Sequence, residues 1–505
     1  MTRVVPLLII LSALVACSGV PQTHRSEKQV AIVGVTVVNP ERYGADASMA
    51  DATVVISGDH ITAVGPRAST PVPAGATRID GKGRWLIPGM IDAHVHFFQS
   101  GNIYTRPDGA DFNAVVPYAQ EDARNKARLT ATFKVWIASG VTSVIDIGGP
   151  FWNFDMRDVA SKTAAAPRVE VAGPLISMVD RVKLDLGDPP IIKILSPEAA
   201  RALVARELER KPDFIKVWFI HQPGDDIEKQ IAIVKAAGDA AHAAGLRLAV
   251  HATELDTAKG SLRAGADYLV HSVFNDPIDD EFIELMRANH AILCPTLFVQ
   301  NGYAYALSNR WQATPEEQRL ADPQILAAMH DLDRIPKDKL PPRVAKLIAD
   351  KPPINPPTVS LQNLKKLWDA KIPIAMGTDA GNIGTLHGPS VFREMALMHD
   401  AGLTPLEVLR TATVGGAMAM GRADLGTIVP GKLADLVLLD ADPLLDVGNL
   451  SHAERVIKGG VIYDPKALID SIRRTTRRFG HRSPCGSGRR SAYWETGWRR
   501  SRRLH

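Results

Sequence analysis

The sequence predicts an α/β protein, a (β/α)8 TIM barrel with a small β-sandwich domain formed by both ends of the chain. Between residues 87 and 423, eight apolar runs of five to eight residues alternate with segments of helical composition. On both sides of this region the pattern changes to short strands joined by glycine-containing turns. The chain has 505 residues, 45% of them hydrophobic, which is enough for one large core with an appended domain.

The barrel prediction depends on strand and helix alternating along the chain. Ser196 followed by Pro197 is typical of a helix start, with serine as the N-cap and proline in the first turn. The other predicted helices cover residues 121–139, 227–244 and 280–289. The expected strands are 90–96, 141–147, 169–175, 214–219, 246–251, 268–273, 291–298 and 372–376.

The connection between the last two predicted strands, residues 300–370, departs from this regular pattern. It is long and contains nine prolines, among them those at positions 336, 341, 342, 352, 353, 356 and 357. Long connections within compact domains usually serve as lids or binding elements. We therefore expect this segment to be a long loop that serves as a lid or a binding element.

The predicted β-sandwich combines residues 30–86 with residues 424–465. In the first part, strand patterns at 53–57 and 60–64 flank a Gly58-Asp59 turn, which is a hairpin signal. In the second part, residues 454–463 contain the turn Gly459-Gly460. Two β-rich ends around a different middle suggest one domain built from both termini.

The N-terminus has the pattern of an export signal. Arg3 is followed by an apolar run, residues 4–15, too short to span a membrane, and then by Ala16 and Cys17. Residues 14–17, LVAC, resemble the bacterial lipobox, which implies cleavage before Cys17 and a lipid on its thiol. We expect a lipoprotein signal peptide at 1–17, a tether at 18–29, and an exported protein anchored on the periplasmic side of a bacterial envelope. A plain secretory or an uncleaved signal is the alternative.

The C-terminal end carries the positive charge of the chain. From Ser471 onward there are eleven arginines and one glutamate, a net charge of +10, although the whole chain has a formal charge of only +4. The rest of the protein is therefore mildly acidic, at −6. We expect residues 466–505 to form a disordered basic tail, and no nucleic-acid partner, since exported proteins seldom meet nucleic acid. Cys294, in an apolar run, is expected to be a buried free thiol.

Side chains that can bind metal stand at the ends of the predicted barrel strands. His94 and His96 are two residues apart on the first strand, so both rings face the same side. Ordinary alternatives exist for each residue: a strand or core histidine, a surface lysine, or a turn-capping aspartate. Sites in such barrels lie at the carboxyl ends of the strands, where the following side chains would converge: His94, His96, Lys216, His251, His271 and Asp379.

With these residues, the chain resembles the amidohydrolase superfamily, most closely its imidazolonepropionase-like and Xaa-Pro dipeptidase-like members. The segments that carry the resemblance are LIPGMIDAHVHFF at 86–98 and GTIVPGKLADLVLLDADPL at 426–444. The resemblance implies two metal ions, most simply Zn²⁺. His94, His96 and Asp379 would hold the first ion and His251 and His271 the second, with Lys216 as a bridging carbamate. Without that carbamate, a single ion on His94, His96, His251 and Asp379 is the alternative.

The resulting functional hypothesis is a metal-dependent hydrolase of a cyclic or dipeptide-like amide, with Asp379 as general base and then acid. An esterase, lactonase or phosphotriesterase on the same site and a non-catalytic metal-binding envelope lipoprotein are the alternatives. His387, His221 and Tyr104 are weaker candidates for contacts with a small-molecule or short peptide substrate. A homo-oligomer is compatible with the sequence. The substrate itself depends on loop shapes that the sequence does not define.

Overall fold

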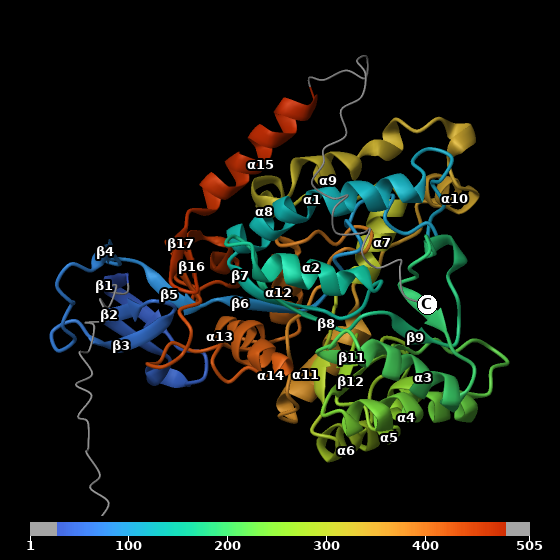
Figure 1. The fold of residues 1–505 in the computed structure, drawn as a ribbon, viewed down its shortest axis with the longest axis horizontal. Helices are drawn as coiled ribbons and strands as arrows, with labels where there is room; N and C mark the ends of the chain where they lie inside the picture. Colours follow the sequence, from blue (N-terminus) through green and yellow to red (C-terminus); the bar gives the residue numbers. More distant parts are fainter. Residues whose placement is uncertain (1–27, 481–505) are drawn as a thin grey trace, which may run out of the picture.

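The two ends of the chain form one β-domain in the computed structural model, which describes residues 28–480, with side chains up to residue 475 (Figure 1). Its eight strands have the order β17-β16-β15-β5-β1-β2-β3, with β4 beside β1. Strand β5 joins the two parts of the chain, since it pairs with β1 on one side and with β15 on the other. The strands are β1 (Gln29–Val38), β2 (Ser48–Ser57), β3 (His60–Pro66), β4 (Thr77–Asp80), β5 (Trp85–Pro88), β15 (Leu436–Leu439), β16 (Ala453–Lys458) and β17 (Val461–Tyr463).

A β-sandwich was predicted for this domain, and its described strands are joined in a single hydrogen-bonded sheet. The edge strand β3 turns back toward the segment before β15: the amide of Ile61 donates to the carbonyl of Lys432, and Gly431 donates to Ile61, both at 2.8 Å. A sheet curled in this way encloses its own apolar side chains, among them Ile32, Val54 and Leu436. A second facing sheet is therefore not needed to bury them.

The middle of the chain is an α/β domain whose strands form two parallel sheets. One has the order β6-β7-β8 and the other β10-β9-β11-β12-β13-β14. Seven of the eight predicted runs contain strands, but the third is divided between β8 and β9 by residues 172–174. The strands are β6 (Met90–Val95), β7 (Val141–Asp146), β8 (Arg168–Val171), β9 (Leu175–Ser177), β10 (Ile191–Lys193), β11 (Phe214–Trp218), β12 (Arg247–His251), β13 (Tyr268–Val270) and β14 (Ile292–Cys294).

The eighth predicted run, residues 372–376, forms no regular strand. Two isolated parallel bridges, Leu293 to Ile374 and Val95 to Ala380, connect this segment to β14 and β6. The arrangement is therefore similar to a TIM barrel, although no closed ladder runs through the described residues. Asp379, three residues beyond the run, adopts a left-handed conformation with φ of 60°, so an extended strand does not continue through it.

The four predicted helices are present, and all but α1 begin with a polar cap, including the predicted one at Ser196. Ser196 accepts a hydrogen bond from Ala199 at the start of α3, and Asp226 and Asp279 cap α4 and α6 in the same way. Helices packed against the parallel strands are α1 (Tyr118–Ala138), α2 (Trp152–Ser161), α3 (Pro197–Leu208), α4 (Ile227–Ala243), α5 (Leu255–Arg263), α6 (Asp280–Ala288), α11 (Thr358–Asp369), α12 (Ser390–Asp400), α13 (Pro405–Arg410) and α14 (Gly416–Met420).

The segment predicted as a long loop is instead largely helical. Besides α11, residues 300–370 contain most of α7 (Val299–Leu307) and all of α8 (Pro315–Leu320), α9 (Pro323–Ala328) and α10 (Pro342–Asp350). Prolines open α8, α9 and α10, where a missing amide hydrogen costs nothing. These helices share a core with the loop after β6, in which Tyr104 and Phe112 pack. We call residues 299–350 the helical insertion.

The predicted disordered tail is also corrected, because it begins with helix α15 (Pro465–Gly480). The first part of this helix contacts the C-terminal end of α1 and buries Ile469 and Ile472 against Val135 and Ala138. Beyond this contact, α15 runs away from α1 at a steep angle (Figure 1). The basic residues hid this apolar spacing at the sequence level. The rest of the tail, the signal peptide with Cys17, and tether residues 18–27 lie outside the described residues. No helix within residues 28–480 has the length and apolar character needed to cross a bilayer.

Candidate metal centre

Strand β6 and the turn after it carry two histidines, His94 on the strand and His96 directly after it. The Nδ1 of His96 donates to the carbonyl oxygen of Gly148 at 2.6 Å, because a carbonyl can only accept. This bond fixes the ring and leaves its Nε2 for a ligand. His94 is also buried, and its Nδ1 has no hydrogen-bond partner.

The two Nε2 atoms and one carboxylate oxygen form a compact triangle. The distances are 3.2 Å between the Nε2 atoms of His94 and His96, and 3.3 and 3.1 Å from them to Oδ1 of Asp379. Ligands about 2.0–2.1 Å from a tetrahedral ion lie roughly 3.3–3.4 Å from one another. The triangle therefore has dimensions that suit one divalent ion.

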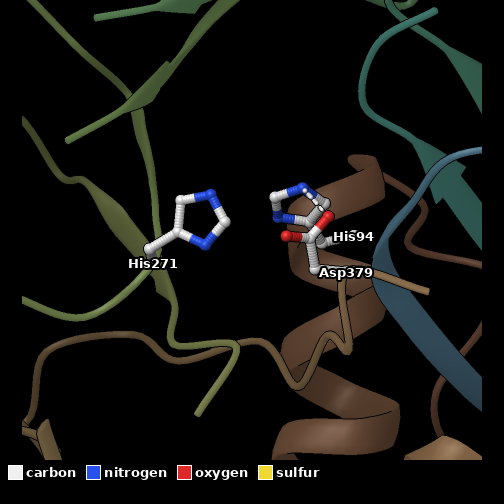
Figure 2. Close-up of side chains that lie close together, drawn as sticks. All are labelled: His94, His271 and Asp379. Carbon is white, nitrogen blue, oxygen red and sulfur yellow. Dashed lines mark ion pairs between the residues drawn. The ribbon is translucent and has the colours of Figure 1, made fainter. Parts of the chain in front are cut away.

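Two further histidines extend this group: His251 at the end of β12, and His271 directly after the adjacent strand β13. The ring centroids of His251 and His271 are 4.4 Å apart, and those of His94 and His271 are 5.0 Å apart. Figure 2 shows His271 facing His94 and Asp379 from a separate part of the chain, and ligand atoms of these three residues lie within 4.8 Å of one another. The Nδ1 of His271 is hydrogen-bonded to the hydroxyl of Thr296 at 2.5 Å. All four histidines are thus gathered around one point.

Backbone strain accompanies this convergence. His271, Thr296 and Asp379 have φ values of 77°, 44° and 60°, in a region that side-chain-bearing residues rarely adopt. Such conformations cost of order 1–3 kcal/mol each and persist where the surrounding structure imposes them, often at functional sites.

Lys216, on β11, completes the set of six predicted metal ligands, and its side chain is buried, with 1% of the residue exposed. No described residue accepts a hydrogen bond from its amine or forms an ion pair with it, although the side chain lines the same cavity as the histidines. Burial lowers the pKa of Lys216 to about 7, because desolvation penalises the ammonium form. The amine is therefore substantially neutral near pH 7.

Burial also determines the charge of the other groups. It lowers the pKa of His94 to about 4 and the pKa values of His251 and His271 well below the usual value. For Asp379, burial alone would raise the pKa, but His94 and His96 hold it well below its ordinary range. Neutral imidazoles with one carboxylate are the donor set that divalent transition metals prefer.

Asp92, a buried aspartate that was not predicted as a site residue, connects the chain segments that carry His94 and Asp379. Oδ1 of Asp92 accepts the amides of His94 and Thr378 at 3.1 and 3.0 Å, and its Oδ2 accepts the Thr378 hydroxyl at 2.5 Å. Asp92 thereby joins β6 to the segment that carries Asp379. Its signal in the sequence was a carboxylate inside an otherwise apolar strand.

The six residues open into a cavity of about 230 Å³. Helix α7 of the helical insertion supplies Val299, Gln300 and Tyr303, which the sequence reasoning missed because it treated this segment as a loop. The remaining wall comes from Phe98, Gln99, Arg106, Leu175, Ile191, Trp218, Thr253 and Asn382.

The three weaker candidates do not line this cavity, so the expectation that they contact substrate there is corrected. His387 is buried, stacks on Phe97 at 5.4 Å and bonds to the carbonyl of Gln99. His221 bonds to Gln230, and the hydroxyl of Tyr104 donates to Asp331 at 3.0 Å. Each side chain has a structural partner, which position after a strand does not reveal. Cys294 is a buried free thiol, as predicted.

Comparison with known proteins supports this description. An imidazolonepropionase from Streptomyces avermitilis is 27% identical over 451 residues, covering 85% of this chain and 87% of that protein. A Bifidobacterium longum protein provisionally assigned as a prolidase is 26% identical, covers 90% of this chain and 100% of its own, and has a TM-score of 0.64. A Xaa-Pro dipeptidase with bound methionine, 22% identical over 86% of this chain and 100% of its own, has the same fold with a TM-score of 0.65.

The amidohydrolase family model matches residues 85–463, which include β5, the whole parallel domain and the returning strands β15 to β17. All six predicted ligand positions lie within this match. The chain therefore belongs to the amidohydrolase family and is a hydrolase that acts on carbon–nitrogen bonds.

Proposed function

We propose that the protein hydrolyses a cyclic amide or a dipeptide-like amide with the help of two divalent metal ions, most simply Zn²⁺. His94, His96 and Asp379 would hold the first ion, and His251 and His271 the second. Lys216 would bridge them as a carbamate. The observation that carries the proposal is the triangle of Nε2 and Oδ1 atoms with edges of 3.1–3.3 Å.

The donor set fits this role on three grounds. The lowered pKa values of His94, His251 and His271 describe neutral rings available as ligands. The neutral amine of Lys216 has the form that reacts with carbon dioxide. The carbamate would turn an unpaired buried amine into an anionic ligand, which resolves the cost of its burial.

When bound, divalent ions lower the pKa of a water toward neutrality and polarise a carbonyl group. The side chains of the protein would supply proton transfer and the walls of the cavity. Asp379 accepts the proton of the attacking water and passes it to the leaving nitrogen. The apolar side chains Phe98, Leu175 and Trp218 form part of the cavity wall beside these groups.

The substrate class and the location are also part of the proposal. The similar proteins named as an imidazolonepropionase and a Xaa-Pro dipeptidase support a cyclic amide or a short peptide. The N-terminal pattern ending at Cys17 supports export and a lipid anchor on the bacterial envelope.

The first test combines metal analysis with a substrate panel of cyclic amides, dipeptides, esters, lactones and phosphotriesters. We expect Asp379→Asn to lower kcat by about 10²–10⁴-fold on the best amide, because the proton acceptor is lost. Asp239→Asn, at an exposed ion pair on α4, serves as the control and should leave kcat unchanged.

Other results would redirect the assignment. A metal-loaded protein that hydrolyses nothing in the panel would favour a metal-binding lipoprotein, and preference for esters or phosphotriesters would replace the amide. Full activity of Asp379→Asn would refute the proposed role of this carboxylate.

A further inference from the structure

Asn382 makes the shortest hydrogen bond to the Asp379 carboxylate. It follows Asp379 by three residues in a tight turn, and its side-chain amide donates to Oδ1 of Asp379 at 2.6 Å. Its backbone amide also bonds to the carbonyl of Asp379 at 3.3 Å. Asn382 is 5% exposed, so bulk water does not compete for these bonds.

Two donors on the other side determine which way the amide of Asn382 points. Its Oδ1 accepts from the hydroxyl of Tyr303 at 2.7 Å and from Nη1 of Arg106 at 3.0 Å. A guanidinium has donors only, so the amide oxygen must face it. The NH2 group is then directed at Asp379. A flipped amide would place donor against donor and oxygen against carboxylate.

Arg106 is itself held in place. Its Nε and Nη2 form a bidentate pair with Asp108 at 2.8 and 2.7 Å, and Asp108 lies 3.2 Å from Arg181. Tyr303 reaches the turn from α7, so the helical insertion contacts the network directly. The connection therefore runs from Arg106 and Tyr303 to the carboxylate through Asn382.

This arrangement makes the two oxygens of Asp379 unequal. Oδ1 faces His94, His96 and the amide of Asn382, whereas Oδ2 has no hydrogen-bond partner among the described residues. Because Asp379 lines the cavity, Oδ2 is the oxygen free to take a proton there.

We propose that Asn382 is a positioning residue, which holds Oδ1 of Asp379 toward the histidines and leaves Oδ2 as the proton acceptor, with Tyr303 and Arg106 orienting its amide. The inference rests on the proposed function of Asp379. It adds a role for the helical insertion, since Tyr303 couples that segment to the reacting group.

The experiment compares the Co²⁺-loaded full-length protein with Asn382→Ala, Asn382→Asp and Tyr303→Phe. We expect both Asn382 variants to keep the wild-type metal content and to lower kcat 10- to 100-fold, with KM within threefold, because a displaced reacting group reduces turnover. Their visible Co²⁺ absorption should shift, since Oδ1 is no longer held. Tyr303→Phe should lower kcat three- to tenfold.

The matched control is Tyr305→Phe on the same helix, because this half-buried tyrosine has no side-chain hydrogen bond in the described structure. It should leave kcat and the spectrum unchanged. Wild-type kcat and absorption in Asn382→Ala would overturn the inference while leaving the proposed function intact. If Asn382→Ala fails to fold, Tyr303→Phe decides, because it keeps the volume of the side chain. An unmodified protein that binds no Co²⁺ would reject both proposals.

Discussion

Lys216 has an environment that few lysines tolerate, buried on a central strand without a counter-ion in hydrogen-bonding distance. Because burial lowers its pKa to about 7, its amine is available to react with carbon dioxide. We expect Lys216→Ala to lower the metal content from two ions to one or fewer and to reduce kcat at least 100-fold.

A short carboxylic acid such as acetate, added at high concentration, should restore part of the lost metal, since it can occupy the space of the carbamate. Metal analysis after gel filtration measures this directly. A fully metal-loaded and active Lys216→Ala protein would exclude the bridging role.

Gly381 shows how closely the Asp379 turn packs against the first strand. Its φ is 110°, and a Cβ added there would lie 2.4 Å from the carbonyl oxygen of His96. We expect Gly381→Ala to lower the free energy of unfolding by more than about 4 kcal/mol and to abolish activity, because neither backbone can move without displacing a ligand.

Gly187→Ala is the matched control, because Gly187 has a φ of 95° but nothing within 4 Å of the added Cβ. Gly187→Ala should lower the free energy of unfolding only by the backbone strain of the left-handed conformation, about 1–3 kcal/mol. Chemical denaturation of the two variants separates the clash from the strain. Equal losses would show that the close approach to His96 does not matter.

The predictable part of the site is its set of ligands, and the reason is periodicity. His94, His96, Lys216 and His251 stand in or directly after apolar runs, and the ends of parallel strands meet at one edge. Asn382, Tyr303 and Arg106 carry no comparable signal. Their contacts depend on a turn and on a helix from elsewhere in the chain, which local pattern cannot place.

At the scale of elements, helix α8 is fastened to the barrel by a buried ion pair. Arg393 on α12 forms a bidentate pair with Glu317, both bonds at 2.7 Å, and the Glu317 side chain is fully buried. We expect Arg393→Met to lower the free energy of unfolding by about 3–5 kcal/mol, because it leaves a buried carboxylate without its partner.

Lys235→Met, which breaks the exposed pair with Asp239 on α4, is the control and should cost no more than about 0.5 kcal/mol. Limited proteolysis of the helical insertion gives a second measurement, since a loosened α8 should be cleaved sooner. Similar losses for the two variants would mean that α8 does not depend on this pair.

Whether a segment forms a strand or a helix was predictable where a single spacing of apolar residues persisted, as in α1, α3, α4 and α6. The errors share a different cause. In residues 300–370, the many prolines suggested a loop, but short helices form there because their first turns tolerate proline. In α15, the many arginines suggested a disordered tail, although apolar residues line one face of the helix. The eighth run is apolar, but it pairs with its neighbours through isolated bridges and not as a regular strand.

At the scale of the whole molecule, bound metal should stabilise the parallel domain as one unit. The candidate ligands come from β6, β11, β12, from just after β13 and from the segment before α12, which no closed ladder joins. We expect removal of metal by a chelator to lower the thermal midpoint by several degrees, since a ligand at 1,000 times its Kd contributes about 4 kcal/mol.

Reloading the apoprotein with Zn²⁺ should restore the midpoint, and calorimetry at a fixed heating rate measures both changes. In His94→Ala the chelator should have a smaller effect, because a ligand is already missing. An unchanged midpoint on chelation of the unmodified protein would show that the ligands are prearranged without metal.

The pairing of β5 with β15 also has a consequence during synthesis on the ribosome. Trp85 pairs with Leu439, so roughly 350 residues must be translated before the exposed edge of β5 finds its neighbour. At about 5–20 residues per second this takes some 20–70 s. An open strand edge is a template for aggregation over that interval. The nascent chain should therefore depend on a chaperone until its last strands emerge.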